Sequence, residues 1–288
     1  MADRGKNRLE QLAVKCRLNV LRMLEASKHG HLGGAFSCMD ILTAIYFYHT
    51  NFDPKEPQKK DRDRFILSAG HKSMAQYAVL AEKGYFPKEL LDTYGQLKSR
   101  LPGHPDMHKL PGVEANTGAL GHGLSIAAGM ALGMRLDRID SKVYVIMGDG
   151  ELCEGSNWEA AALAAHYNLD KLVVFVDYNG LQISGKVEEI MNMTPIDKHF
   201  EAFGWKVKNI DGNDMDEIIS AMDSIPLERG KPSLFVAHTT KSKGLKKGEG
   251  KAAYHYWTPE PEELCDAKED LLRSLAVLEG EEAVFHGN

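Results

Sequence analysis

Two stretches of the sequence decide the fold: VYVIMGDGE at residues 143–151 and LVVFVDYNGL at residues 172–181. Each begins with an uninterrupted apolar run of strand length, which is typical of a strand buried on both faces of a parallel sheet. The Ala-rich residues 155–166 between them predict a helix. Strand, turn, helix and strand form a βαβ crossover, which places the carboxyl ends of both strands side by side at one edge of the sheet.

Polar residues follow both strands at that edge. Asp149 follows the first strand and Asn179 follows the second, so we expect their side chains to be neighbours. Together they offer two hard oxygen ligands to one divalent cation. The Gly150 amide and the start of the following helix suit the anion that often accompanies such a cation, a diphosphate. The sequence therefore predicts a metal–diphosphate site at the ends of these strands.

The composition is ordinary for a globular protein. The chain has 288 residues, of which 43% are hydrophobic and 26% charged, and this length suits one large α/β domain. The net charge of −6 argues against a nucleic-acid or anionic-membrane surface. No apolar stretch approaches the ~18–20 residues of a membrane span. The four cysteines contain no CxxC pair and are expected to be reduced thiols of a cytoplasmic protein.

Strands and helices continue to alternate along the rest of the chain, which predicts an α/β fold. We expect a parallel sheet with helices on both faces, in a single domain over residues 1–288 that ends in a helical extension. Ser37 is expected to cap a helix with Asp40 as its capping-box partner. The GxxxG of Gly129 and Gly133 predicts close helix packing. Further strands are expected at 65–68, 204–207 and 234–238, helices at 8–26, 38–48, 74–82 and 261–278, and a functional loop at 94–119.

Several histidines lie beside glycine in separate loops. Loop histidines next to glycine can approach a ligand closely and are not needed for core packing. Several of them in one chain, together with a metal–diphosphate site, predict a polar pocket that handles hydroxyls, carbonyls or phosphates near neutral pH. The residues are His31, His71, His104 and His122, with His255 in an aromatic segment, YHYW.

The order of these motifs resembles a known family. GDGE at 148–151 followed by NGL at 179–181 is similar to the metal and diphosphate signature of thiamine diphosphate enzymes. More narrowly, the chain resembles the N-terminal, diphosphate-binding half of transketolase along nearly its whole length. This resemblance implies the thiamine diphosphate-binding fold, in its diphosphate-binding (PP) module. The supporting segments are HGHLG at 29–33, DRFILSAGH at 63–71, PGHP at 102–105 and PGVEANTGALG at 111–121.

The resemblance assigns binding roles to residues. It makes the Asp149 and Asn179 side chains and the Leu181 backbone carbonyl the metal ligands. Such a set suits Mg²⁺, or Ca²⁺ or Mn²⁺, because all three donors are hard oxygens. The residues that it assigns to thiamine diphosphate are His71, Gly118, Ala119, Leu120, Gly150, Glu151, Asn179, Lys241 and His255.

Catalytic roles follow from the same resemblance. His31, His71, His104 and His255 are expected to line the channel to the thiazolium carbon, where they position the donor sugar and assist proton transfer. Glu154 matches an acid at the subunit interface that hydrogen-bonds towards the catalytic glutamate of the other half of the site. Leu32 stands where the family usually has proline, and this departure bears on substrate contacts more than on the cofactor site.

The implied activity is that of a transketolase-type transferase, which moves a two-carbon ketol unit from a ketose (phosphate) to an aldose (phosphate). The resemblance supplies no counterpart for the glutamate that protonates the aminopyrimidine of the cofactor. A separate C-terminal subunit with the pyrimidine-binding domain and that glutamate is therefore expected, in an α₂β₂ heterotetramer, and the chain alone should be inactive. The sugars stay open, between those of the pentose phosphate pathway and those of a specialised pathway.

Two alternatives remain at this point. One is a subunit of another thiamine diphosphate enzyme, either deoxyxylulose-phosphate-synthase-like or a 2-oxo-acid dehydrogenase. The other is a non-catalytic regulator that binds thiamine diphosphate.

Overall fold

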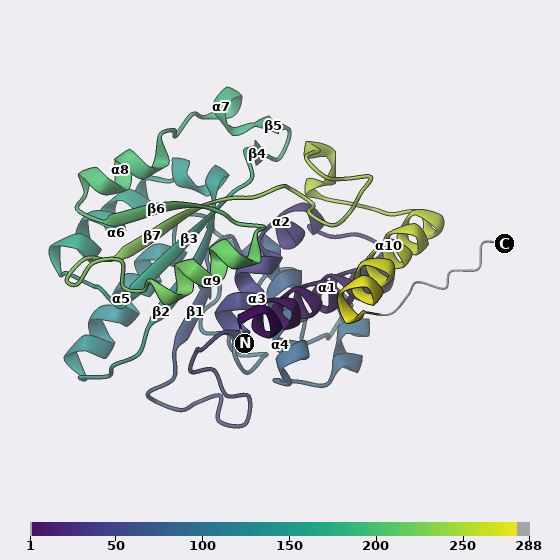
Figure 1. Cartoon of the computed structure of the whole chain (residues 1–288), viewed down its shortest axis with the longest axis horizontal. Coiled ribbons are helices and arrows are strands. Elements are labelled where there is room, and N and C mark those ends of the chain that lie inside the picture. The colour runs from purple at the N-terminus through teal and green to yellow at the C-terminus, as the bar shows by residue number, and fades with distance from the viewer. Residues whose placement is uncertain (1, 281–288) are drawn as a thin grey trace.

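A five-stranded parallel sheet lies between two layers of helices in the computed structural model, which describes residues 2–280 and the side chains of residues 5–280 (Figure 1). This arrangement confirms the predicted fold class. Both decisive apolar runs are neighbouring central strands, with Gly148 paired to Asp177 at their carboxyl ends. In spatial order the strands are β1 (Arg64–Leu67), β2 (Val143–Gly148), β3 (Leu172–Tyr178), β7 (Ser233–His238) and β6 (Lys206–Asp211).

The apolar runs exist because successive strand residues face opposite helix layers. Tyr144 and Ile146 of β2 belong to one buried cluster, whereas Val143, Val145 and Met147 belong to the other. The first cluster is shared with α1 (Ala2–Ser27), α3 (Met39–Phe47), α4 (Ser73–Lys83) and α9 (Met215–Asp223), and the second with α5 (Gly123–Leu136), α6 (Gly155–His166) and α8 (Ile196–Ala202).

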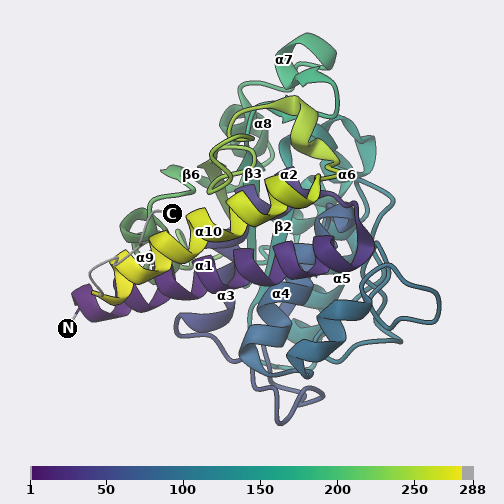
Figure 2. The same ribbon diagram turned by 90° about the vertical axis from the view of Figure 1, so that its right-hand side faces the viewer.

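The last helix, α10 (Pro261–Glu279), runs beside α1 on the outside of the first layer (Figure 2). The side-chain amide of Gln11 donates to the Leu278 carbonyl at 3.0 Å. Leu264, Ala267 and Leu271 bury the inner side of α10 in the first cluster. The predicted C-terminal helix is therefore confirmed. No helix in the described range 2–280 is long and apolar enough to cross a membrane.

The predicted capping box at Ser37 is wrong. Ser37 is the last residue of a separate short helix, α2 (Leu32–Ser37), and α3 starts after Cys38. The Ser37 hydroxyl donates to Asp177 at 2.6 Å, and Asp40 accepts from Arg17 at 2.8 Å. Both side chains are buried and have found long-range partners, which outweigh a local cap.

Short elements complete the chain, and most of them were not predicted. Residues 94–119 form no helix or strand, as the sequence indicated. The remaining elements are a hairpin of β4 (Leu181–Gln182) and β5 (Gly185–Lys186), the helix α7 (Val187–Ile190), and the 3₁₀ turns η1 (Gly70–Lys72), η2 (Lys88–Thr93), η3 (Asp149–Cys153) and η4 (Ala252–His255).

Candidate active site

The carboxyl ends of β1, β2 and β3 lead into one cavity of about 240 Å³. Ligand sites of open parallel sheets lie at this edge, outside the ends of the strands. The cavity gathers residues from segments far apart in the sequence. Its lining includes most of the predicted site residues: His31, His71, Gly118, Leu120, Asp149, Gly150, Glu151, Asn179, Leu181, Lys241 and His255.

Three oxygen donors from β2, β3 and the turn after β3 line the cavity, as the sequence predicted. Asp149 is 3% exposed, and its carboxylate accepts from the amides of Gly150 at 2.8 Å and Gly180 at 2.6 Å. Asn179 Oδ1 accepts from the Leu181 amide at 3.2 Å. Burial, together with the neighbouring Asp177, raises the pKa of Asp149 to about 6.

These residues fit a hard divalent cation. Carboxylate, amide and carbonyl oxygens are the ligands that Mg²⁺ and Ca²⁺ take in proteins. Asp149 is the only acid among the three, which agrees with the lack of any metal-like cluster of three His, Cys, Asp or Glu within residues 2–280. The Leu181 carbonyl accepts from Lys241 Nζ at 3.0 Å, so this oxygen is directed at a cation.

The floor of the cavity also fits an anion. Gly150 belongs to the turn η3, and a Cβ there would lie 3.0 Å from the Gln182 side chain. Gln182 Oε1 is buried and has no hydrogen-bond partner among the residues that the structure describes. Lys241 is 2% exposed and lines the same cavity. Its burial lowers the pKa of the ammonium to about 8. The cavity thus holds a buried cation beside the three oxygen donors.

The loop at 117–120 closes one wall of the cavity. Gly118 has a φ of +151°, and a Cβ there would lie 2.9 Å from His104 Cδ2. A Cβ at Gly70 would fall 2.5 Å from the carbonyl carbon of Thr117. The two glycines therefore let three loops meet. Leu120 lines the cavity with Gly118, whereas the predicted cofactor residue Ala119 is exposed beside them.

Four of the predicted histidines form one group. The ring centroids of His31, His71 and His255 are 5.3 to 5.4 Å apart, and that of His104 is 6.4 Å from His31. They come from four separate segments: the start of α2, η1, η4 and the 94–119 loop. No periodic pattern in the sequence shows this proximity, since it depends on the way the loops close over the strand ends.

Burial keeps three of these rings neutral. It lowers the pKa of His71 to about 2 and that of His255 to about 4, and it also lowers the pKa of His31. Neighbouring cationic groups act in the same direction. A neutral imidazole has one donor and one acceptor nitrogen, which suits hydrogen bonding to sugar hydroxyls. His255 Nδ1 lies 3.3 Å from Lys241 Nζ, so this nitrogen can accept from the ammonium.

The two predicted glutamates differ in their surroundings. Glu151 is 2% exposed, and its carboxylate accepts from the amides of Gly121 at 2.9 Å and Gly148 at 3.2 Å, and from the Ser68 hydroxyl. It therefore ties the 118–121 loop to the end of β2, while burial raises its pKa. Glu154 lies outside the cavity, exposed at the start of α6, so its interface role stays a prediction.

Sequence reasoning missed several residues of this site. Lys72 and Gln182 line the cavity, and the Tyr256 ring lies 4.8 Å from that of His31 and hydrogen-bonds to His29. Lys72 directly follows His71, and that adjacency was the one available signal.

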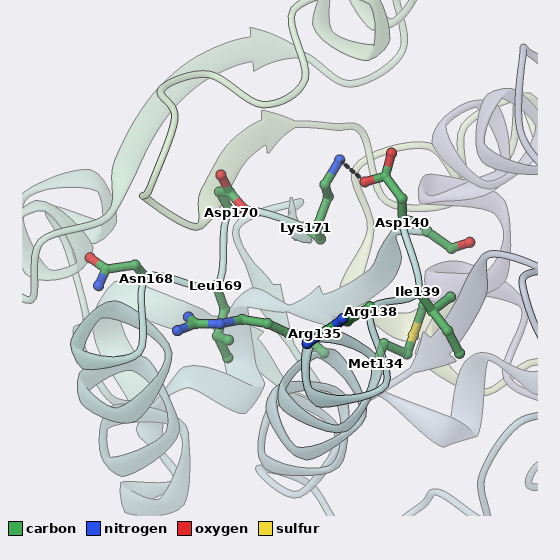
Figure 3. Close-up of a pocket in the computed structure, with 11 residues that line it drawn as sticks. Met134, Arg135, Arg138, Ile139, Asp140, Asn168, Leu169, Asp170 and Lys171 are labelled. Carbon is green, nitrogen blue, oxygen red and sulfur yellow. Dashed lines mark ion pairs between the residues drawn. The ribbon is translucent and has the colours of Figure 1, made fainter.

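A second hollow, of about 270 Å³, lies at the opposite edge of the sheet, near the amino ends of β2 and β3 (Figure 3). Arg135, Lys171 and Asp140 are among its lining residues. Lys171 pairs with Asp140 at 2.6 Å, and the guanidinium of Arg135 donates to the Tyr167 carbonyl. None of the predicted site residues lines this hollow.

Comparison with known proteins agrees with the geometry. Residues 9–271 match the family described as "Transketolase, thiamine diphosphate binding domain". One of the two subunits of an apulose-4-phosphate transketolase from Phocaeicola vulgatus is 42% identical, over 95% of this chain and 97% of that protein. A 6-deoxy-6-sulfo-D-fructose transketolase subunit of a Clostridium species is 43% identical, over 85% of this chain and 91% of that protein.

Solved structures give the same result. A transketolase from Campylobacter jejuni superimposes with a TM-score of 0.84 at 32% identity, over 94% of this chain and 46% of that one. The transketolase from Leishmania mexicana also gives 0.84, at 27% identity, and is covered to 45%. The chain thus spans about half the length of these transketolases. It belongs to the transketolase family, through the domain that binds thiamine diphosphate.

Proposed function

We propose that this chain is the diphosphate-binding subunit of a two-chain transketolase. The reaction moves a two-carbon ketol unit from a ketose donor to an aldose acceptor. One observation carries the proposal: the oxygen donors Asp149 and Asn179 and the group of neutral histidines line the same cavity. A site that only senses a cofactor needs the first set and has no use for the second. The names of the two bacterial relatives support the same activity.

Each half of the cavity has its own task. The Asp149 carboxylate, Asn179 Oδ1 and the Leu181 carbonyl would hold Mg²⁺, with Ca²⁺ or Mn²⁺ as substitutes. The Gly150 amide, the His71 ring and Lys241 would bind the diphosphate group. Asp149 now accepts from the Gly150 amide, so that amide has to be shared with or released to the diphosphate. Bound thiamine diphosphate supplies the electron sink for breaking and forming the carbon–carbon bond.

The histidines act on the substrate. As neutral rings, His31, His104 and His255 can hydrogen-bond to the hydroxyl and carbonyl oxygens of the donor and can take up or release a proton there. Gly118 and Leu120 would lie against the aminopyrimidine, next to Ala119, and Glu151 would hold this loop in place through the Gly121 amide.

The substrates that we propose are sugars with an anionic substituent. One relative is named for a sugar phosphate and the other for a sulfo sugar. Tyr256 and His29, beside His31, add a phenol and an imidazole to the group that meets the sugar. A donor with a phosphate or sulfonate at the end remote from its carbonyl fits this proposal.

A second polypeptide completes the site in this proposal. It carries the pyrimidine-binding domain and the catalytic glutamate, and the assembly is an α₂β₂ heterotetramer. Both bacterial relatives are named as subunits, which supports a partner. The outer side of α5 and α6 suits contact with another chain, because it exposes Leu136, Leu163 and Tyr167. Glu154 lies at the start of α6 and would point into this contact. The four cysteines are free, which suits the cytoplasm.

The chain and its partner, purified together with thiamine diphosphate and Mg²⁺, provide the test. With a ketose phosphate and an aldose phosphate, NMR should detect an aldose two carbons shorter than the donor and a ketose two carbons longer than the acceptor. Release of CO₂ from pyruvate with no ketol transfer would instead assign the chain to the decarboxylating enzymes. Full activity in an Asp149→Ala variant would favour a regulator without a catalytic site.

A further inference from the structure

Lys72 is a buried cation at the floor of the cofactor cavity, and the proposed mechanism does not use it. It ends the turn η1 and is 2% exposed. Its stem passes beneath Gly34, where a Cβ would lie 2.9 Å from Lys72 Cε. Its ammonium lies beneath Gly148, where a Cβ would be 3.5 Å from Nζ. Lys72 therefore reaches the end of β2 directly before Asp149.

The partner of this ammonium is Asp177. Lys72 Nζ lies 2.5 Å from Asp177 Oδ2, and Asp177 has no exposed surface. The carboxylate also accepts from the hydroxyls of Ser37, at 2.6 Å, and Thr239. Both oxygens of Asp177 are thus held by protein groups and are not offered to the cavity.

Asp177 and Asp149 are adjacent acids. Asp177 is the Cα partner of Gly148 across β2 and β3, and Asp149 is the next residue. Two ionised carboxylates this close in a buried site repel each other unless a cation compensates one of them. Lys72 compensates Asp177, which leaves Asp149 as the carboxylate that faces the cavity.

The balance of charge then decides which ligand the cavity accepts. Lys72 and Lys241 both lie in its lining, so a divalent cation alone meets two ammonium groups. A cation that arrives together with a diphosphate brings the anion that these ammonium groups attract. The site would therefore be weak for the metal alone and strong for the metal–diphosphate pair.

We propose that Lys72 is a positioning residue that neutralises Asp177, and that it thereby makes the site accept a divalent metal jointly with diphosphate and not by itself. The inference rests on the proposed metal site at Asp149, Asn179 and Leu181. It concerns binding, so it can be tested without turnover.

The test titrates the full chain with free Mn²⁺ and, separately, with preformed Mn²⁺–diphosphate, and follows both by EPR. Lys72→Met leaves an uncompensated acid at Asp177. We expect it to weaken binding of the Mn²⁺–diphosphate complex about tenfold or more, while binding of free Mn²⁺ stays equal or becomes tighter. A parallel loss of both affinities would mean that Lys72 only supports the fold, and would overturn the proposal.

A double variant covers the case in which Lys72→Met does not fold. Lys72→Met with Asp177→Asn removes both charges and leaves no buried ion without a partner. It should recover most of the affinity for the Mn²⁺–diphosphate complex. If that affinity stays as low as in Lys72→Met, Lys72 acts by touching the diphosphate itself and the neutralisation idea is wrong.

Two controls separate this inference from the proposed function. Lys171→Met removes a cation at the opposite edge of the sheet and should leave both affinities unchanged. Asp149→Asn should abolish tight binding of the complex. If Asp149→Asn binds the complex normally, the metal site itself is misplaced. If Asp149→Asn loses binding and the double variant stays weak, only the inference about Lys72 fails.

Discussion

Gly70 and Gly118 show how single residues allow the loops of the cofactor cavity to touch. A Cβ at Gly70 would lie 2.5 Å from the carbonyl carbon of Thr117 and 2.6 Å from its oxygen. These are backbone atoms, so they cannot rotate out of the way. The contact fixes the turn that carries His71 against the loop that carries Gly118.

Replacing Gly70 by alanine should therefore damage both the fold and the cavity. We expect Gly70→Ala to lower the free energy of unfolding by about 1–3 kcal/mol, as overpacking does, and to weaken binding of thiamine diphosphate. Urea unfolding and a binding titration measure the two effects. The control is Gly129→Ala on α5, where a Cβ meets no atom within 4 Å. Wild-type stability of Gly70→Ala would contradict the packing described here.

The buried histidines make stability depend on pH. Folded His71 and His255 have pKa values of about 2 and about 4, below the value of 6.5 expected in the unfolded chain. As the pH falls below 6.5, the unfolded chain takes up protons that the folded chain does not. Stability is therefore complete above pH 6.5 and is lost progressively towards pH 4.

A variant without one of these rings should lose part of that dependence. His71→Asn should flatten the slope of the free energy of unfolding between pH 6.5 and 4, measured by urea unfolding at several pH values. His166→Asn, at the exposed end of α6, is the matched control and should keep the wild-type slope. An unchanged slope in His71→Asn would show that His71 is protonated in the folded chain.

The sequence predicted residues at strand ends better than residues buried between loops. Asp149, Asn179 and Leu181 could be placed because the two apolar runs locate the ends of two neighbouring strands. Lys72 and Asp177 are 105 positions apart in sequence, and no local pattern announces their ion pair. The approach of His31 to His255 depends in the same way on loop closure, and only the resemblance to a family indicated it.

At the scale of elements, long segments with a clear period were predicted and short ones were not. β2, β3, α6 and α10 lie within a residue of the expected ranges. The hairpin of β4 and β5 has two residues in each strand, too few for any period to be visible. The helix expected to start after Ser37 was misplaced at its start because its polar residues bind distant partners.

Helix α5 gives a second correction. Gly129 and Gly133 predicted close helix packing, but a Cβ at either position meets no atom within 4 Å among the described residues. Both glycines are exposed, so the packing is not made within this part of the chain. The proposed partner interface on α5 and α6 accounts for a smooth face of this kind.

A large charged side chain on this face should therefore prevent assembly. Gly133→Arg should abolish formation of the two-chain complex in sedimentation velocity, while the urea unfolding of the isolated chain changes by less than about 1 kcal/mol. Leu272→Arg, at an exposed position of α10, is the control and should assemble normally. Normal assembly of Gly133→Arg would place the partner elsewhere.

At the scale of the whole molecule, the parallel sheet presents one edge for chemistry and keeps the other edge structural. The cavity with the predicted metal donors and histidines lies at the carboxyl ends of the strands. The hollow at the amino ends has its lysine and one arginine engaged by protein groups. The cavity accounts for the binding of the diphosphate end of the cofactor. Activation of the other end is the task that we assign to a second chain.

The measurement that tests this central claim most directly is ketol transfer by the separately purified chains. Each chain is assayed with thiamine diphosphate, Mg²⁺, a ketose phosphate and an aldose phosphate, first alone and then after mixing. We predict no transfer by either chain alone and transfer after mixing, with a rate that saturates at equal amounts of the two chains. Transfer at the full rate by this chain alone would contradict the claim.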